Sequence, residues 1–94
     1  MGLYVVAYDV ADDDRRERLS LMLTGYGPRV QMSVFEVEVS TKTGLRELKK
    51  RIREVVDRQE DQVRIYPIAS QDVGAITIIG ARMIEERADY WVVR

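Results

Sequence analysis

The chain of 94 residues is long enough for one small domain, whose core lies near the lower size limit for independent stability, so a partner subunit would help it. Hydrophobic residues make up 46% of the chain and charged residues 33%, which excludes an intrinsically disordered protein. Cysteine and histidine are absent, which excludes disulfides, thiolate nucleophiles, the usual zinc sites and imidazole bases. Any chemistry must therefore use carboxylates, Tyr, Lys, Arg or a hard metal ion held by oxygen.

The charges nearly cancel in total, to a formal net charge of −1, but they are unevenly distributed. Residues 1–14 contain four acidic and no basic side chains, whereas residues 15–58 contain eleven basic and six acidic ones. This distribution permits a local basic surface. The apolar runs are far shorter than the roughly 20 residues of a membrane span, and the N-terminus lacks the basic start of a signal peptide. We expect a cytoplasmic protein with no membrane contact.

A buried strand followed by a helix is predicted at the start of the chain. Residues 3–9, LYVVAYD, are apolar or aromatic on both alternating faces, as in a strand that is buried on both sides. One Asp among residues 12–14 would cap the following helix, in which apolar residues recur at helical spacing. The sequence GYGP at residues 25–28 is expected to end this helix.

The segment 30–39, VQMSVFEVEV, alternates with a period of two, but its apolar positions change face near Val34 and Phe35. A regular strand with one buried face cannot change face in this way. The pattern therefore predicts a bulge, a sharp bend or a division into two short strands.

A second helix is predicted after residues 40–44, with an apolar stripe that faces the core. The other side of this helix is basic. It is either a solvated surface or a track for a nucleic-acid backbone. Its basic residues are Arg46, Lys49, Lys50 and Arg53.

Three further strands are predicted at residues 63–69, 75–80 and 90–93, with Pro67 marking an incomplete hydrogen-bond ladder. Together the elements predict one α+β domain over residues 1–94, a sandwich with two helices on one face of a mostly antiparallel sheet and an extra C-terminal strand. The other face of the sheet is expected to be equally apolar and covered by a second copy of the chain. Residues 81–94 would be an extension used in dimer or partner contacts.

Asp9 closes the first predicted strand, next to the start of a helix. An Asp at a strand end often only bonds the backbone that follows, and this interpretation stays open. Alternatively, its carboxylate holds Mg²⁺ or Mn²⁺, which prefer oxygen ligands and would activate water without a histidine. Because one carboxylate binds such an ion poorly, the second would be Asp9 of a partner copy at a two-fold axis. Asp12, Asp13 and Asp14 are explained sufficiently by helix capping.

The arginines at the start of the first helix, Arg15, Arg16 and Arg18, have two interpretations. They are ordinary surface residues, or they bind phosphate, for which the guanidinium group is well suited. No aromatic residues are interleaved with them, so stacking on single-stranded bases is not indicated.

Three segments of the chain together resemble the CRISPR-associated Cas-two family, the small subunit of the spacer-acquisition machinery of bacteria and archaea. They are YDVADDDRRERL, GYGPRVQMSVFEVEV and VRIYPIA, and the resemblance runs from Tyr4 to about Gly80. It implies a ferredoxin-like homodimer that acts as an Mg²⁺- or Mn²⁺-dependent endonuclease on RNA or DNA. It also implies a central dimer that bridges the integrase subunits, the Cas-one proteins.

The resemblance assigns individual residues. Asp9 matches the metal-binding, catalytic aspartate, and Tyr8 matches the tyrosine beside it. Nucleic-acid contacts are assigned to Arg16, Arg18, Arg29, Ser33 and Phe35. A ferredoxin-like order needs two strands between the helices, so residues 30–39 must divide there or the connectivity departs from the standard one.

Two main hypotheses follow. The first is a metal-dependent endonuclease that cleaves phosphodiester bonds. The second is a dimeric scaffold without catalysis that binds duplex DNA and docks the integrase through its C-terminal strand. A ferredoxin-like dimer that senses a ligand is a third interpretation.

Overall fold

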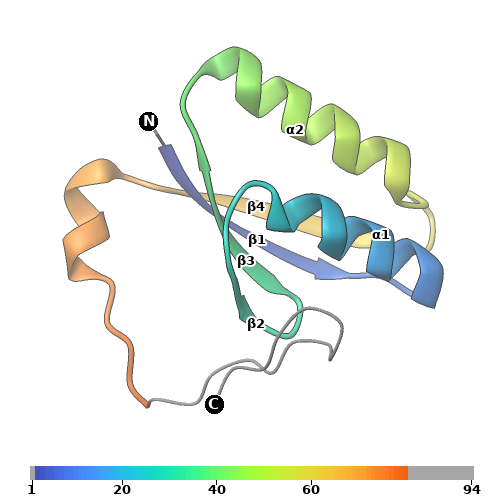
Figure 1. Ribbon diagram of the computed structural model, residues 1–94, viewed down its shortest axis with the longest axis horizontal. Helices are drawn as coiled ribbons and strands as arrows, with labels where there is room; N and C mark the ends of the chain where they lie inside the picture. Colours follow the sequence, from blue (N-terminus) through green and yellow to red (C-terminus); the bar gives the residue numbers. More distant parts are fainter. Residues whose placement is uncertain (1, 81–94) are drawn as a thin grey trace.

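Four strands and two helices follow one another in the order βαββαβ, and a short 3-10 helix comes after them (Figure 1). This computed structural model describes residues 2–80. The predicted strand at 90–93 and the extension at 81–94 lie outside the described residues. The elements are β1 (Gly2–Asp9), α1 (Asp13–Thr24), β2 (Arg29–Gln31), β3 (Val34–Val39), α2 (Lys42–Val55), β4 (Gln62–Ile68) and η1 (Ser70–Ala75).

The strands form one antiparallel sheet in the order β2-β3-β1-β4, in which β1 is an inner strand and β2 and β4 are the edges. Both helices cover the same face of this sheet (Figure 1). This is the ferredoxin-like arrangement, so the predicted fold class is confirmed. Within residues 2–80, no helix is long and apolar enough to cross a membrane.

Each helix begins at a residue whose side chain caps its N-terminus, as the residue preferences of helix N-caps predict. Asp12 is the N-cap of α1, and its Oδ2 accepts a hydrogen bond of 2.9 Å from the backbone N–H of Arg15. Thr41 caps α2, and its Oγ1 accepts a bond of 2.9 Å from the N–H of Gly44. Each bond satisfies an N–H group that has no partner inside its helix.

The change of face near Val34 is a chain reversal. Residues 32 and 33 form a turn between β2 and β3, and the pairing is irregular between Arg29 and Gln31. The division into two short strands, one of the three predicted outcomes, is therefore confirmed. The backbone N–H of Tyr8 donates a 3.0 Å bond to the carbonyl of Ser33, which ties this turn to β1.

The core lies between the sheet and the two helices. Six of its side chains are fully buried, and each contributes roughly 1.5–3 kcal/mol relative to an exposed position. They are Val6, Leu19, Leu23, Phe35, Val37 and Leu48. Because they come from β1, α1, β3 and α2, these four elements depend on one another.

The face of the sheet without helices, called the open face below, is not equally apolar, so this part of the prediction is wrong. Leu3 and Val5 on β1 lie half-buried there, but they pair across the strands with Glu38 and Glu36 of β3. On its other side, β1 meets Arg64 and Tyr66 of β4. The alternation VFEVEV turns Phe35, Val37 and Val39 to the core, so Glu36 and Glu38 must occupy the open face.

The strand predicted at 75–80 is also wrong. Residues 70–75 form η1, and residues 76–80 have no regular secondary structure. Ile78 and Ile79 are 82% and 94% exposed. High β-propensity forms a strand only where a neighbouring strand supplies hydrogen bonds, and the described chain leaves this segment unpaired.

Gly27 lies where the loop after α1 approaches β3 most closely. A Cβ on Gly27 would sit 1.9 Å from the carbonyl oxygen of Glu36 and 2.9 Å from the Cα of Val37, whereas a Cβ on Gly25 would meet only the Met22 carbonyl oxygen at 3.5 Å. We predict that Gly27→Ala lowers the free energy of unfolding by about 3 kcal/mol, because backbone must move to admit the methyl group. Urea denaturation measures this loss. Gly25→Ala is the matched control and should change stability by less than about 1 kcal/mol; equal effects of the two variants would contradict the prediction.

Candidate nucleic-acid and metal-binding site

Asp9 lies exposed at the carboxyl end of β1, and the alternation of the strand places it on the open face. Its neighbour across the sheet is Gln62 of β4. Residues 2–80 contain no group of three or more Asp, Glu, His or Cys side chains that could hold a metal ion. One copy of the described chain therefore offers fewer than three such ligands at this position.

Tyr8 points to the other face of the sheet. Its side chain is only 7% exposed, and its ring stacks on Phe35 with the centroids 6.3 Å apart and the planes at 26°. Successive side chains of a strand alternate between faces, so Tyr8 and Asp9 cannot share one site within a protomer. The assignment of both residues to catalysis stays a prediction, and within one protomer their side chains lie on opposite faces of the sheet.

Four of the predicted residues gather on the helix side instead. Tyr8, Arg16, Arg29 and Ser33 line a hollow of about 310 Å³ between α1 and the β2–β3 turn. We call it the arginine hollow. Its other lining residues are Asp13, Glu17, Ser20 and Met32. Four of the seven residues assigned by resemblance thus form a cluster, to which Asp9, Arg18 and Phe35 do not belong.

Arg29 is the most firmly held side chain of the arginine hollow. Its Nη2 donates a hydrogen bond to Oγ of Ser20, and its guanidinium lies over the Phe35 ring, 5.5 Å from the centroid. Its Nε is buried without a hydrogen-bond partner among the described residues. An unsatisfied buried donor costs about 1–3 kcal/mol.

Phe35 is fully buried in the core. The prediction that it touches nucleic acid is therefore corrected, because its ring reaches the arginine hollow only by supporting Arg29 and Tyr8. A role in positioning replaces a role in direct contact.

The arginines of α1 divide among three environments. Arg16 forms an exposed ion pair with Asp13, at 2.6 Å, beside the arginine hollow. Arg18 is exposed on another side of the helix, over a shallow surface that includes Asp14 and Leu21. Arg15 turns inward, and its guanidinium group is engaged by the Asp61 carboxylate.

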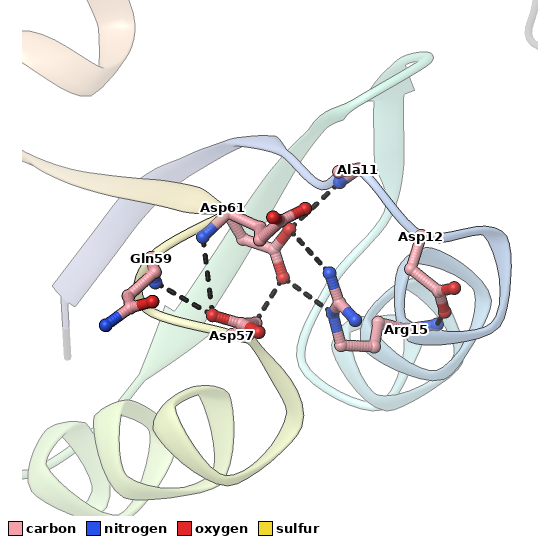
Figure 2. Close-up of polar contacts among 7 residues, drawn as sticks. Ala11, Asp12, Arg15, Asp57, Gln59 and Asp61 are labelled. Atoms are coloured by element: carbon pink, nitrogen blue, oxygen red, sulfur yellow. Dashed lines mark hydrogen bonds and ion pairs between the residues drawn. The ribbon is translucent and has the colours of Figure 1, made fainter.

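Arg15 forms an ion pair with Asp61, at the centre of a group of hydrogen bonds that the sequence did not predict (Figure 2). We call this group the Asp61 hub. The fully buried Asp61 carboxylate accepts hydrogen bonds from Nε and Nη2 of Arg15 at 2.8 and 3.1 Å. It also accepts bonds from the backbone N–H groups of Ala11, at 2.9 Å, and Asp57, at 2.8 Å. No sequence signal marks this pair, because its members lie 46 residues apart.

These four donors hold the pKa of Asp61 well below its ordinary value of 3.8, and the hydrogen bond from Arg15 is the largest cause. The same contact raises the pKa of Arg15. Because Ala11 follows Asp9 by two residues, the hub also fixes the backbone that leaves the carboxyl end of β1.

The fold and the site define a class: a small ferredoxin-like domain with an exposed acid at the end of an inner strand and a separate cluster of arginines. The family model described as CRISPR associated protein Cas2 matches residues 1–76. The chain belongs to the Cas2 family, as the resemblance predicted.

Bacterial relatives are similar to this chain over most of their length. A protein named CRISPR-associated endoribonuclease Cas2 3, from Synechocystis, is 45% identical over 80 residues, which are 85% of this chain and 86% of that protein. A protein named CRISPR-associated endonuclease Cas2 2, from Thermus thermophilus, is 48% identical over 69 residues, 73% of this chain and 76% of that one.

Solved structures of the family have the same fold. Cas2 from Streptococcus pyogenes superposes with a TM-score of 0.73 at 28% identity and covers 83% of this chain and 99% of its own. A chain of a partial Cas6-RT-Cas1–Cas2 complex superposes with a TM-score of 0.73 at 34% identity and covers 84% of this chain and 91% of its own.

We predict that Asp61 makes the protein acid-sensitive. A carboxyl group with a lowered pKa in the folded state stabilises the protein above its ordinary value of 3.8, and this stabilisation is lost as the pH falls below that value. Asp61→Asn should therefore be less stable than the unmodified protein at neutral pH, and the difference should shrink progressively as the pH is lowered below about 4.

Chemical denaturation over a pH series measures this convergence. Asp72→Asn is the matched control, since Asp72 is exposed on η1 and should leave the pH dependence unchanged. A constant stability difference between Asp61→Asn and the unmodified protein across the acid range would contradict the prediction.

Proposed function

We propose that this protein is a metal-dependent endonuclease that cleaves RNA or DNA as a homodimer in CRISPR adaptation. The observation that carries the proposal is the position of Asp9, exposed on the open face at the end of an inner strand. A second copy packed against this face can bring an identical carboxylate to the same point. The printed names of the relatives, endoribonuclease and endonuclease, support the nuclease class.

The donor set at Asp9 suits Mg²⁺ or Mn²⁺. Mg²⁺ usually keeps several waters and is held by one or two carboxylates together with the phosphates of a substrate, rather than by a cage of protein ligands. One Asp9 from each protomer would supply two carboxylates of this kind. A cation held there would stabilise the charge that develops on the phosphate and activate water at neutral pH.

The arginine hollow suits the phosphates of the substrate. The ion pair of Arg16 with Asp13 is exposed and worth little, so a phosphate can displace it without a large penalty. Arg29 is oriented by Ser20 and Phe35 and has a donor without a partner. We propose that these arginines, with Ser33 at the rim and Arg18 on the outer side of α1, position the nucleic-acid backbone.

The exposed apolar residues after β4 support the dimer. Ile76, Ile78 and Ile79 are 40%, 82% and 94% exposed, which is unusual for three large apolar side chains so close together in a monomer. Tyr66 is 45% exposed on the open face. A second copy covering these side chains would remove them from water.

A scaffold that bridges integrase subunits is the second candidate function. It is favoured by the structural similarity to a chain whose complex is named as containing Cas1 and Cas2. Catalysis and bridging would use different surfaces, because Asp9 lies on the open face and the C-terminal residues were predicted to dock the partner.

Asp9→Asn should reduce metal-dependent cleavage by about 100-fold or more, since Lewis-acid stabilisation by the cation is worth several kcal/mol. Cleavage is measured on matched RNA and DNA substrates with Mg²⁺, Mn²⁺ or EDTA. Asp14→Asn, which removes an exposed carboxylate from α1, should cleave at the original rate. The nuclease proposal fails if Asp9→Asn cleaves as fast as the unmodified protein.

The scaffold proposal makes a separate prediction for cells. Asp9→Asn should leave spacer acquisition intact, whereas truncation after Asp89 should abolish it because the integrase would lose its docking segment. Counting new spacers in an acquiring culture tests both variants. Loss of acquisition in Asp9→Asn together with normal acquisition by the truncated chain would reject the scaffold role.

A further inference from the structure

The arginine hollow lies on the wrong face of the sheet to serve the phosphate group at Asp9. Asp9 is on the open face, whereas Arg29 contacts Ser20 of α1 on the helix side. Arg16 belongs to α1 itself and lines the same hollow. Side chains on opposite faces of a sheet do not meet at one phosphate group. Among the described residues, a cation that contacts the phosphate at Asp9 would have to come from the open face.

Arg64 is the only basic side chain on the open face of the four described strands. These strands contain two basic residues, Arg29 and Arg64, and Arg29 faces the helices. Arg64 alternates with Val63 and Ile65, which pack against the core, so it projects from the other face. Its side chain is exposed. The sheet thus offers one arginine on the same face as Asp9.

The register of β1 and β4 places Arg64 beside Asp9. The two strands run antiparallel next to each other (Figure 1), with Gln62 opposite Asp9 and Arg64 opposite Ala7. Arg64 is therefore the diagonal neighbour of Asp9 on one face, and diagonal pairs lie roughly 7–8 Å apart, within reach of a long side chain. A phosphate group bound at Asp9 is then within reach of the Arg64 guanidinium.

Arg64 is held by its own strand and not by Asp9. Its Nε donates a 3.0 Å bond to Oε1 of Gln62, and its Nη1 donates a 3.1 Å bond to the hydroxyl of Tyr66. Within residues 2–80, Arg64 forms no ion pair. The two neutral partners therefore orient the guanidinium without neutralising its charge.

The rest of the guanidinium suits a phosphate group. An arginine has five N–H donors, and Arg64 uses two of them on Gln62 and Tyr66, which leaves three without a partner among residues 2–80. These donors belong to the planar fork that binds phosphate oxygens in pairs. Negative charge develops on the non-bridging oxygens as water attacks phosphorus, so a fixed cation there stabilises the transition state more than the ground state.

We propose that Arg64 is a catalytic residue of the Asp9 site and binds the phosphate group that is cleaved. This proposal rests on the proposed nuclease function. The oxygen of water forms a bond to phosphorus, the bond to the leaving oxygen breaks, and the proton lost by water is balanced by one gained by the leaving oxygen. Arg64 keeps its charge throughout and stabilises the non-bridging oxygens. Gln62 and Tyr66 are positioning residues that orient its guanidinium.

Steady-state cleavage of the nucleic acid that the unmodified protein cleaves in Mg²⁺ separates kcat from KM. Arg64→Ala should lower kcat by about 100-fold, as expected when one preorganised donor is lost, and change KM by less than about threefold. Tyr66→Phe removes the hydroxyl that holds Nη1 and should lower kcat by about threefold to tenfold. Arg58→Ala, the matched control, removes an exposed arginine from the turn before β4 and should keep the original kcat.

Two further measurements separate catalysis from structure. Guanidinium ion at a concentration that does not denature the protein should raise the kcat of Arg64→Ala by about tenfold, because it replaces the lost charge without its fixed orientation. It should leave Arg58→Ala unchanged. Binding of the same substrate in EDTA, measured by anisotropy, should be weakened less than about threefold in Arg64→Ala.

Asp9→Asn, measured alongside, distinguishes the possible failures. If Asp9→Asn loses cleavage while Arg64→Ala keeps its kcat, the Arg64 proposal is rejected and the nuclease proposal stands. If Asp9→Asn cleaves as fast as the unmodified protein, both proposals are rejected. A raised KM with an unchanged kcat in Arg64→Ala would limit Arg64 to ground-state binding and overturn its catalytic role.

The oligomeric state of Arg64→Ala completes the test, because Arg64 lies on the face where the second copy is proposed to pack. Size-exclusion chromatography should give the same elution volume for Arg64→Ala and the unmodified protein. Dissociation of the variant, or a loss of kcat that guanidinium ion does not restore, would make Arg64 a structural residue and overturn the proposal.

Discussion

The hydrogen bonds and the ion pair of the buried Asp61 carboxylate hold together the segments that carry the candidate site. The carboxylate joins three segments, the loop after β1, the first turn of α1 and the loop before β4, through Ala11, Arg15 and Asp57. A carboxylate removed from water is tolerated only when charged and polar donors surround it, so these segments must keep this arrangement. Since the chain enters the hub just after Asp9, the end of β1 is held in one direction.

The pleat of β1 places the Asp9 carboxylate and the arginine hollow on opposite faces of the sheet. Asp9 faces the open side of the sheet, whereas Tyr8 faces the helices and the arginine hollow. A single protomer therefore presents an acid on one face and, on the other, the arginines that we propose bind phosphate. In a homodimer built on the open face, the two Asp9 side chains would lie at the interface and the arginines of the hollow on the outer surfaces.

Most of the local structure could be predicted because it depends on short-range rules. The caps at Asp12 and Thr41 and the apolar spacing of both helices are properties of neighbouring residues. The change of face at Val34 revealed the hairpin, although it could not choose between a bend and a reversal. The strand expected at 75–80 was wrong because apolar β-branched residues need a neighbouring strand, which is a property of the whole fold.

The sequence by itself determined the elements, the candidate residues and the family likeness, since these follow from residue order alone. Only the tertiary structure decided which of those residues meet. In the tertiary structure, Arg15 forms an ion pair with the buried carboxylate of Asp61, and Phe35 lies in the core. Arg16 and Arg29 line one hollow. The physical reason is that side-chain direction depends on pleat, helix phase and the packing of segments far apart in the chain, and no local pattern records these together.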